Sequence, residues 1–251
     1  MFDVVEFYPS ISEKLLNETL SWAKQYTSIS EIEHDAIMHA RRTLLFDISG
    51  SAWIKKDNSS GFDVAMGAYD GAEICEMVGL YILQVLTKEL KVDSLGLYRD
   101  DGLATLRNCS GRVADQVRKN IIRLCNERFG LKVTVETNLK IVNYLDVTFN
   151  LNTGIHQPYR KPNNPPLYIN TRSNHPPIIL KNIPAGIGRR ISNLSSNKEV
   201  FDQASGTYNE ALSSSGYKEK IEYNEHKKNC TKKKRRRRKI IWFNPRSRGV
   251  T

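Results

Sequence analysis

The chain has 251 residues, of which 39% are hydrophobic, and a formal net charge of +11. This length suits one large domain or one domain with an appendage, and no stretch approaches the roughly 20 consecutive apolar residues that span a bilayer. Residues 227–251 hold 12 Lys and Arg and no Asp or Glu, so residues 1–226 carry a net charge of 11 − 12 = −1. The excess of positive charge therefore lies in residues 227–251, and net charge gives no indication of the function of residues 1–226. That function has to be inferred from sequence motifs.

The cysteines and the first residues exclude two further classes of protein. The four cysteines form no CxxC pair and have no histidine at metal-ligand spacing, which predicts reduced thiols rather than a zinc site or a disulfide framework. The opening MFDVVEFYPS has neither a basic start nor an apolar run, so no secretory signal is expected. An intracellular protein that is not a membrane protein follows from these patterns.

The first 61 residues predict a strand followed by two helices and a loop. Residues 2–5 form an apolar strand, and the spacing of Ser10 and Glu13 predicts a capping box at the start of the first helix. Ser30 and Glu33 repeat this signature before a second helix. A polar stretch rich in Gly and Ser then predicts a hairpin or loop.

Beyond it, short strands alternate with longer helices. The apolar periodicity predicts, in chain order, a strand at 62–66, a turn at 67–71, a helix at 72–90, hairpin arms at 95–98 and 102–106, a helix at 113–129, and strands at 131–136 and 143–151. Prolines interrupt the chain after residue 152, leaving short helical patches near 178–180 and 187–194. This order predicts an α+β fold in which a small antiparallel sheet, built from strands near Asp3, Leu97, Val133 and Val147, packs on helices.

Three carboxylates fall where two separate backbone elements could bring them together. Asp3 lies on the first strand, and Asp100 and Asp101 lie at the tip of the predicted hairpin. Phosphoryl transfer with two Mg²⁺ ions requires carboxylates that converge from separate elements, because hard cations prefer oxygen ligands. The alternative is a polar turn, since Asp-Gly is a common turn pair. Periodicity alone leaves both interpretations open.

The surrounding residues resemble the catalytic motifs of reverse transcriptases. Residues 2–11, FDVVEFYPSI, are similar to the first catalytic motif of that family, and Tyr98-Arg99-Asp100-Asp101 is similar to its YxDD box. The resemblance implies that Asp3, Asp100 and Asp101 are catalytic, holding two Mg²⁺ ions or Mn²⁺ in their place. It also implies that Tyr8 lies beneath the sugar of the incoming nucleotide and selects deoxynucleotides.

Further residues acquire roles only through this resemblance. Met66-Gly67-Ala68-Tyr69 resembles the turn before a palm helix, which implies that Gly67 lets the backbone approach the nucleotide. The helix that follows begins with the acidic residues Asp70, Glu73 and Glu76, a departure from the family that would repel a nucleic-acid backbone facing it. Arg99, in the variable position of the box, is expected to contact the primer.

The next strands, and the segment after them, extend the resemblance toward one subfamily. Tyr144-Leu145-Asp146-Val147 resembles the primer grip, which argues against Asp146 as a third metal ligand. Tyr159-Arg160-Lys161-Pro162, with Ser173-Asn174-His175-Pro176 after it, resembles the thumb entry of Penelope-like retroelement polymerases. The resemblance implies that Arg160 and Lys161 hold nucleic-acid phosphates. His175 is expected to be structural.

The resemblance implies a palm at 1–152 without its fingers region, a thumb-like region at 153–212 and a basic, largely disordered tail at 213–251. The implied function is RNA-directed DNA polymerase of a retroelement, acting on an RNA template, a DNA primer and deoxynucleotides. Because the fingers are expected to be missing, a catalytically inactive nucleic-acid-binding remnant stays open as the alternative. The eight consecutive cations at 232–239 predict nucleic-acid binding, recognition by a nuclear-import receptor, or a solvated linker.

Overall fold

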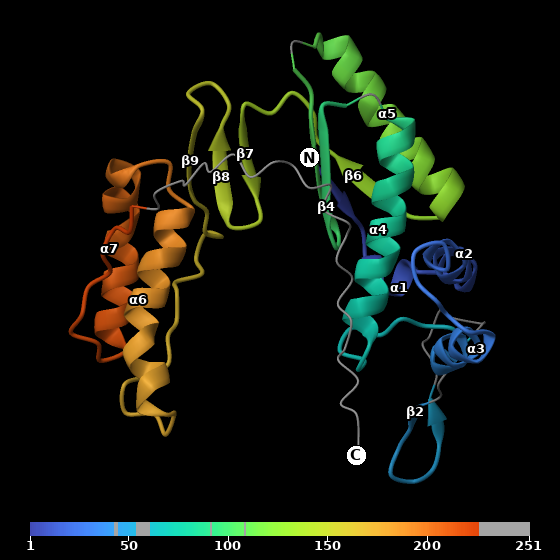
Figure 1. Ribbon diagram of the computed structural model, residues 1–251, viewed down its shortest axis with the longest axis horizontal. Coiled ribbons are helices and arrows are strands. Elements are labelled where there is room, and N and C mark those ends of the chain that lie inside the picture. The colour runs from blue at the N-terminus through green and yellow to red at the C-terminus, as the bar shows by residue number, and fades with distance from the viewer. Residues whose placement is uncertain (43–44, 54–60, 91, 108, 226–251) are drawn as a thin grey trace. The chain divides into compact units, whose positions relative to one another are not determined.

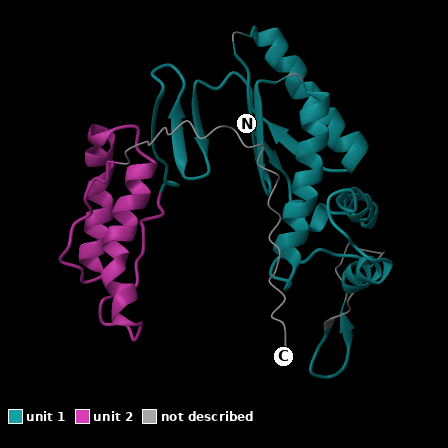
Figure 2. Ribbon diagram, in the orientation of Figure 1, with its two compact units in different colours: residues 1–162 teal, residues 163–251 magenta. Residues whose placement is uncertain are grey.

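The computed structural model describes residues 1–42, 45–53, 61–90, 92–107 and 109–225. The chain divides into two compact units, Met1–Pro162 and a second unit that begins at Asn163 (Figure 2). The first unit continues past the predicted palm boundary at residue 152, because β9 (Ile155–Pro158) pairs with β8 (Val147–Asn150). The palm-like part therefore includes the strand that leads to the predicted thumb entry.

A four-stranded antiparallel sheet forms the centre of the first unit. Its strand order is β4-β5-β1-β6, with β1 (Phe2–Val4) between β5 (Asp101–Thr105) and β6 (Val133–Val135), and β4 (Ser94–Tyr98) at one edge. The first strand, only three residues long, is thus paired on both sides. This arrangement gives Asp3 a fixed place inside the sheet.

Helices cover this sheet and supply most of the core. The helices of this unit are α1 (Phe7–Ser10), α2 (Glu13–Ala23), α3 (Glu31–Ala40), α4 (Gly71–Glu89) and α5 (Gly111–Phe129). Figure 1 shows α4 and α5 running beside the sheet, and α2 packs on α4. Leu16, Val78, Leu86 and Cys125 are completely buried where these elements meet, as the helical periodicity requires. The helices predicted at 72–90 and 113–129 are confirmed.

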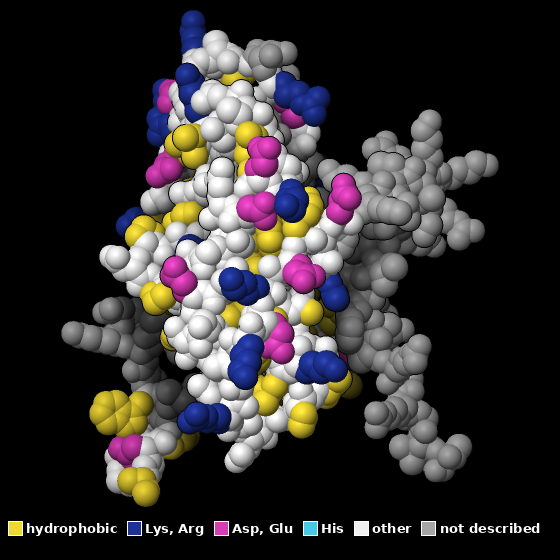
Figure 3. All heavy atoms as spheres, turned by 90° about the vertical axis from the view of Figure 1, so that its left-hand side faces the viewer, with side chains coloured by type: hydrophobic (Ala, Val, Ile, Leu, Met, Phe, Trp, Pro, Cys, Tyr) yellow, Lys and Arg dark blue, Asp and Glu magenta, His cyan; other side chains and the backbone are white. Residues whose placement is uncertain are grey.

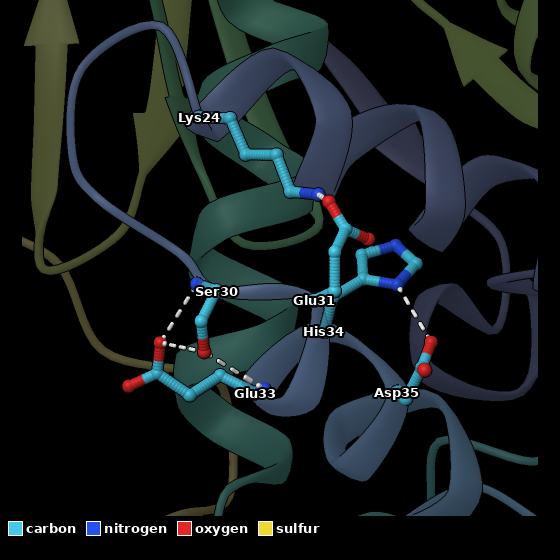
Figure 4. Close-up of polar contacts among 6 residues, drawn as sticks. All are labelled: Lys24, Ser30, Glu31, Glu33, His34 and Asp35. Carbon is cyan, nitrogen blue, oxygen red and sulfur yellow. Dashed lines mark hydrogen bonds and ion pairs between the residues drawn. The ribbon is translucent and has the colours of Figure 1, made fainter.

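The two predicted helix starts differ in outcome. Ser30 and Glu33 form the predicted capping box, in which the Glu33 carboxylate accepts from the Ser30 amide at 2.8 Å (Figure 4). The predicted cap at Ser10 is wrong, because Ser12 is the residue that accepts from an amide of α2, that of Leu15. Ser10 instead ends α1 and donates its hydroxyl to the Val5 carbonyl.

Two strand predictions are corrected by the packing. Phe62 and Val64 are buried in alternation, but residues 62–66 form no strand within the part of the chain that the structure describes, and the Asp63 amide donates to the carbonyl of Arg41 at the end of α3. One-sided burial produced the alternation there. Val147 lies outside the central sheet, because β8 forms a separate three-stranded sheet with β7 (Ile141–Tyr144) and β9. A short exposed hairpin, β2 (Leu45–Phe46) and β3 (Ala52–Trp53), occupies the predicted loop.

The second unit is a helical hairpin with its own core. Its helices are α6 (Pro177–Asn193) and α7 (Lys198–Ser214). The two predicted short patches form one helix, in which Pro184 is buried. Tyr217 and Ile221 are also buried in this core, so ordered packing continues beyond residue 213, where apolar content falls. The predictions for the basic run at 227–239 lie outside the described residues.

Cationic and acidic side chains are interspersed on the face of the molecule drawn in Figure 3, so that face carries no large patch of one sign. Within the described ranges, no helix is long and apolar enough to cross a membrane. Cys75 and Cys125 are buried free thiols and Cys109 is an exposed one, as the sequence predicts for reduced cysteines.

Candidate polymerase active site

The acidic tip is a tight hairpin that joins β4 to β5. Tyr98 pairs with Asp101, which leaves Arg99 and Asp100 as the two turn residues. Arg99 has φ of 54°, in the left-handed region that disfavours residues other than glycine. Such a conformation costs roughly 1–3 kcal/mol and persists only where the surrounding structure holds it. The turn that presents the carboxylates is therefore held by its neighbours.

Strand pairing brings Asp3 beside this hairpin. Asp3 lies directly opposite Asp101 in the β1–β5 ladder, and the Val4 amide donates to the Asp100 carbonyl at 2.9 Å. Two carboxylates opposite each other on neighbouring strands repel, so this register is costly without compensation. The structure thus brings together all three carboxylates that the sequence singled out.

The pKa shifts record the same proximity. Burial raises the pKa of the Asp3 carboxyl, and the charges of Asp100 and Asp101 raise it further. Burial and Asp100 also raise the pKa of Asp101, while the ammonium of Lys161 acts in the opposite direction. Desolvation and like charges both disfavour the ionised form, so this corner of the sheet holds more negative charge than its own residues neutralise.

The donor set suits a hard divalent cation. All three side chains offer carboxylate oxygens, which Mg²⁺ and Mn²⁺ prefer, and a cation between them would relieve their repulsion. In the part of the chain that the structure describes, no three His, Cys, Asp or Glu side chains are already arranged as a metal-coordinating cluster.

Tyr8 faces the same corner from α1. Burial raises the pKa of the Tyr8 phenol; the charge of Arg99 lowers this pKa, and the charge of Asp100 raises it. The hydroxyl of Tyr8 hydrogen-bonds to the thiol of Cys75 on α4. Burial raises the pKa of that thiol to about 12, so Cys75 is a neutral packing residue under Tyr8. The residue expected beneath the incoming sugar therefore adjoins the carboxylates.

Arg99 turns back toward the protein. Its guanidinium pairs with Glu76 of α4 at 3.7 Å and lies 5.6 Å from the ring centroid of Tyr98. This ion pair joins the β4–β5 turn to α4 and neutralises one of the acidic residues near the start of that helix. Primer contact by Arg99 stays a prediction.

The turn before α4 has the backbone that its glycine implies. Gly67 is exposed with φ of 93°, which a residue with a side chain rarely adopts. Asp70, at the start of α4, accepts two hydrogen bonds of 2.5 Å from the buried guanidinium of Arg41. The buried Arg41 thereby neutralises the charge of Asp70. In the part of the chain that the structure describes, no contact joins Gly67 to Asp3, Asp100 or Asp101, so its role at the nucleotide stays a prediction.

The third sheet contributes residues that the sequence did not place at the carboxylates. The hydroxyl of Tyr144, the last residue of β7, donates to the Asp101 carbonyl at 3.2 Å. Lys161, expected to hold phosphates, lies within electrostatic reach of Asp101, whereas Arg160 is half-buried and keeps its role as a prediction. The sequence resemblance placed Tyr144-Leu145-Asp146-Val147 at the primer grip and gave Tyr144 no role at the carboxylates.

No protein-family model matches this chain, and no curated protein matches it. The telomerase from Candida albicans, solved in complex with a TWJ fragment of telomeric RNA, aligns with 12% identity and a TM-score of 0.55, over 85% of this chain and 38% of that chain. The apo telomerase from Candida tropicalis, truncated from its C-terminal domain, aligns with 14% identity and a TM-score of 0.46, over 63% and 34%.

The likeness to the Candida albicans telomerase shows that the aligned part of this chain shares the fold of part of that protein. The chain spans 38% of the length of that protein, so the activity of a whole polymerase does not transfer with the fold. The Penelope-like type stays a prediction from the thumb-entry residues.

Proposed function

We propose that this chain carries the palm active site of an RNA-directed DNA polymerase, in which Asp3, Asp100 and Asp101 hold two divalent cations. The observation that carries the proposal is the register that sets Asp3 opposite Asp101, next to the hairpin turn at Asp100. Carboxylates are costly to desolvate and to crowd, and a site that accumulates three of them suits a cationic cofactor.

The chemistry expected of the bound cations is activation of a primer hydroxyl and stabilisation of charge on the transferred phosphate. The chain itself supplies position. β1 and β5 fix Asp3 and Asp101 on adjacent strands, and the hairpin turn places Asp100 at the exposed end. Since Asp3 and Asp101 lie on paired strands, the spacing between these two carboxylates is set by the ladder and not by flexible loops.

Tyr8 and Arg99 are proposed to shape the nucleotide side of this site. The Tyr8 ring, held from below by Cys75, would exclude a 2′-hydroxyl and so favour deoxynucleotides. Glu76 holds the Arg99 guanidinium near Tyr8, from where Arg99 is expected to contact the primer. The retroelement origin and the Penelope-like subfamily rest on sequence resemblance alone.

The test combines metal binding with primer extension. Mn²⁺ affinity and extension of a DNA primer on an RNA template would be measured for wild type, Asp100→Asn and Asp35→Asn. Asp35 is the matched control, since it is an exposed carboxylate on α3, outside the carboxylate site. We expect Asp100→Asn to lose extension and to bind Mn²⁺ at least tenfold more weakly, because a metal ligand must be charged.

The two remaining outcomes discriminate between functions. If both variants extend primers as wild type does, the role given to Asp100 is wrong. If wild type neither binds Mn²⁺ nor extends, but still binds nucleic acid, the chain is the inactive binding remnant that the sequence left open. Salt-sensitive affinity that depends on residues 227–251 would then identify the tail as its binding element.

A further inference from the structure

Tyr144 ends its strand as Tyr98 ends the catalytic arm. Tyr144 pairs with Val147 across a two-residue turn, as Tyr98 pairs with Asp101. The first turn residue has positive φ in both hairpins, 52° at Leu145 and 54° at Arg99. Two turns with positive φ at the same position therefore lie in one unit. The hydroxyl of Tyr144 links the β7–β8 hairpin to the β4–β5 hairpin.

The segment around Tyr144 is tied together at its own end. The Asp146 carbonyl, in the β7–β8 turn, accepts from the Tyr159 amide at 2.7 Å. Tyr159 follows β9 and precedes Lys161, whose ammonium acts on Asp101. The turn end of the three-stranded sheet thus presents a hydroxyl to the backbone of Asp101 and a cation toward its carboxylate.

We propose that Tyr144 is a positioning residue of the carboxylate site, whose hydroxyl fixes Asp101 by holding its backbone carbonyl. This inference rests on the proposed function, because it assumes that Asp101 is a metal ligand. Tyr144 is partly buried, and the bond at 3.2 Å joins two separate sheets. Without it, the first residue of β5 would keep its ladder pairing but lose the support that reaches it from β7.

The experiment removes this hydroxyl alone. Tyr144→Phe keeps the ring, and Tyr217→Phe is the matched control, since the Tyr217 hydroxyl also donates to a backbone carbonyl, that of Ile169 at 2.9 Å, within the second unit. Mn²⁺ dissociation constants would be measured by electron paramagnetic resonance of the free ion, beside thermal unfolding of each variant. A single hydrogen bond is worth a factor of about two to ten, so we expect Tyr144→Phe to weaken Mn²⁺ binding by that factor.

The control separates positioning from general loss of stability. We expect Tyr217→Phe to lower the unfolding temperature by about as much as Tyr144→Phe does, because each variant loses one hydrogen bond to a backbone carbonyl. Tyr217→Phe should leave Mn²⁺ affinity unchanged. Equal Mn²⁺ affinity in Tyr144→Phe and wild type would overturn the inference while leaving the proposed function standing. Failure of wild type to bind Mn²⁺ would overturn both the inference and the proposed function. Asp101→Asn serves as the reference for loss of a metal ligand, and we expect this variant to bind Mn²⁺ at least tenfold more weakly than wild type.

Discussion

Gly102 lies just after the β4–β5 turn and has no room for a side chain. A Cβ built there would lie 2.1 Å from Cζ of Phe2, whose ring is 2% exposed and directly opposite in the β1–β5 ladder. Ordinary contact begins at about 3.4 Å, so either the ring or the strand has to move by more than 1 Å in Gly102→Ala. Overpacking of this kind costs about 1–3 kcal/mol, with complete expulsion of a buried Phe as the ceiling, at about 3–5 kcal/mol.

The matched control is Gly96→Ala in the neighbouring strand β4, where an added Cβ meets nothing within 4 Å. We expect Gly102→Ala to lower the unfolding temperature of the first unit by roughly 2–12 °C, and Gly96→Ala to leave it unchanged or slightly higher. Adding Phe2→Leu should recover part of the loss, because a smaller side chain frees the space. Equal unfolding temperatures for both glycine variants, measured by circular dichroism, would refute the packing argument.

Three further predictions address charge. Burial, and then the charge of Asp100, raise the pKa of folded Asp101, so stability from this group is present below its ordinary pKa of 3.8 and is lost as pH rises through the raised value. Asp101→Asn should therefore unfold at a higher temperature than wild type at pH 7, by a margin that shrinks toward pH 4; no gain at pH 7 contradicts this. Arg41→Gln, which strips the buried partner from Asp70, should cost roughly 2–4 kcal/mol in urea unfolding, against less than about 1 kcal/mol for Arg42→Gln, whose pair is solvent-exposed. Deleting 227–251 should weaken nucleic-acid binding and flatten its salt dependence, and an unchanged salt slope would exclude the tail as the binding element.

The helices α4 and α5 and the β4–β5 hairpin could be predicted from the sequence, because the patterns that form them involve residues close together in the chain. The long stripes on α4 and α5 and the cap at Ser30 depend on residues within a few positions of one another. The register of Asp3 against Asp101 depends on a pairing between distant segments, which no spacing rule supplies. Only the resemblance to reverse-transcriptase motifs indicated that these carboxylates share a site.

The predictions that failed concern features that depend on contacts beyond the local sequence. β8 alternates like a palm strand, yet its partners are β7 and β9, because short turns let consecutive strands pair with each other first. Pro184 was expected to divide a helix that in fact continues through it. The hydroxyl of Tyr144 reaches Asp101 across 43 positions, and a lone tyrosine at the end of a strand carries no sequence signal for such a contact.

The acidic start of α4 shows how partners change the meaning of a sequence pattern. Asp70, Glu73 and Glu76 favour the helix dipole but would repel a nucleic-acid backbone, and the sequence alone could not resolve this conflict. The structure neutralises Asp70 with the buried Arg41, 29 positions earlier, and pairs Glu76 with Arg99 of the β4–β5 turn. Two of the three charges are thus used to hold the turn before α4 and the turn at Asp100. Under the proposed function, the acidic start of α4 does not conflict with template binding, because Asp70 and Glu76 are paired with cations of the chain itself.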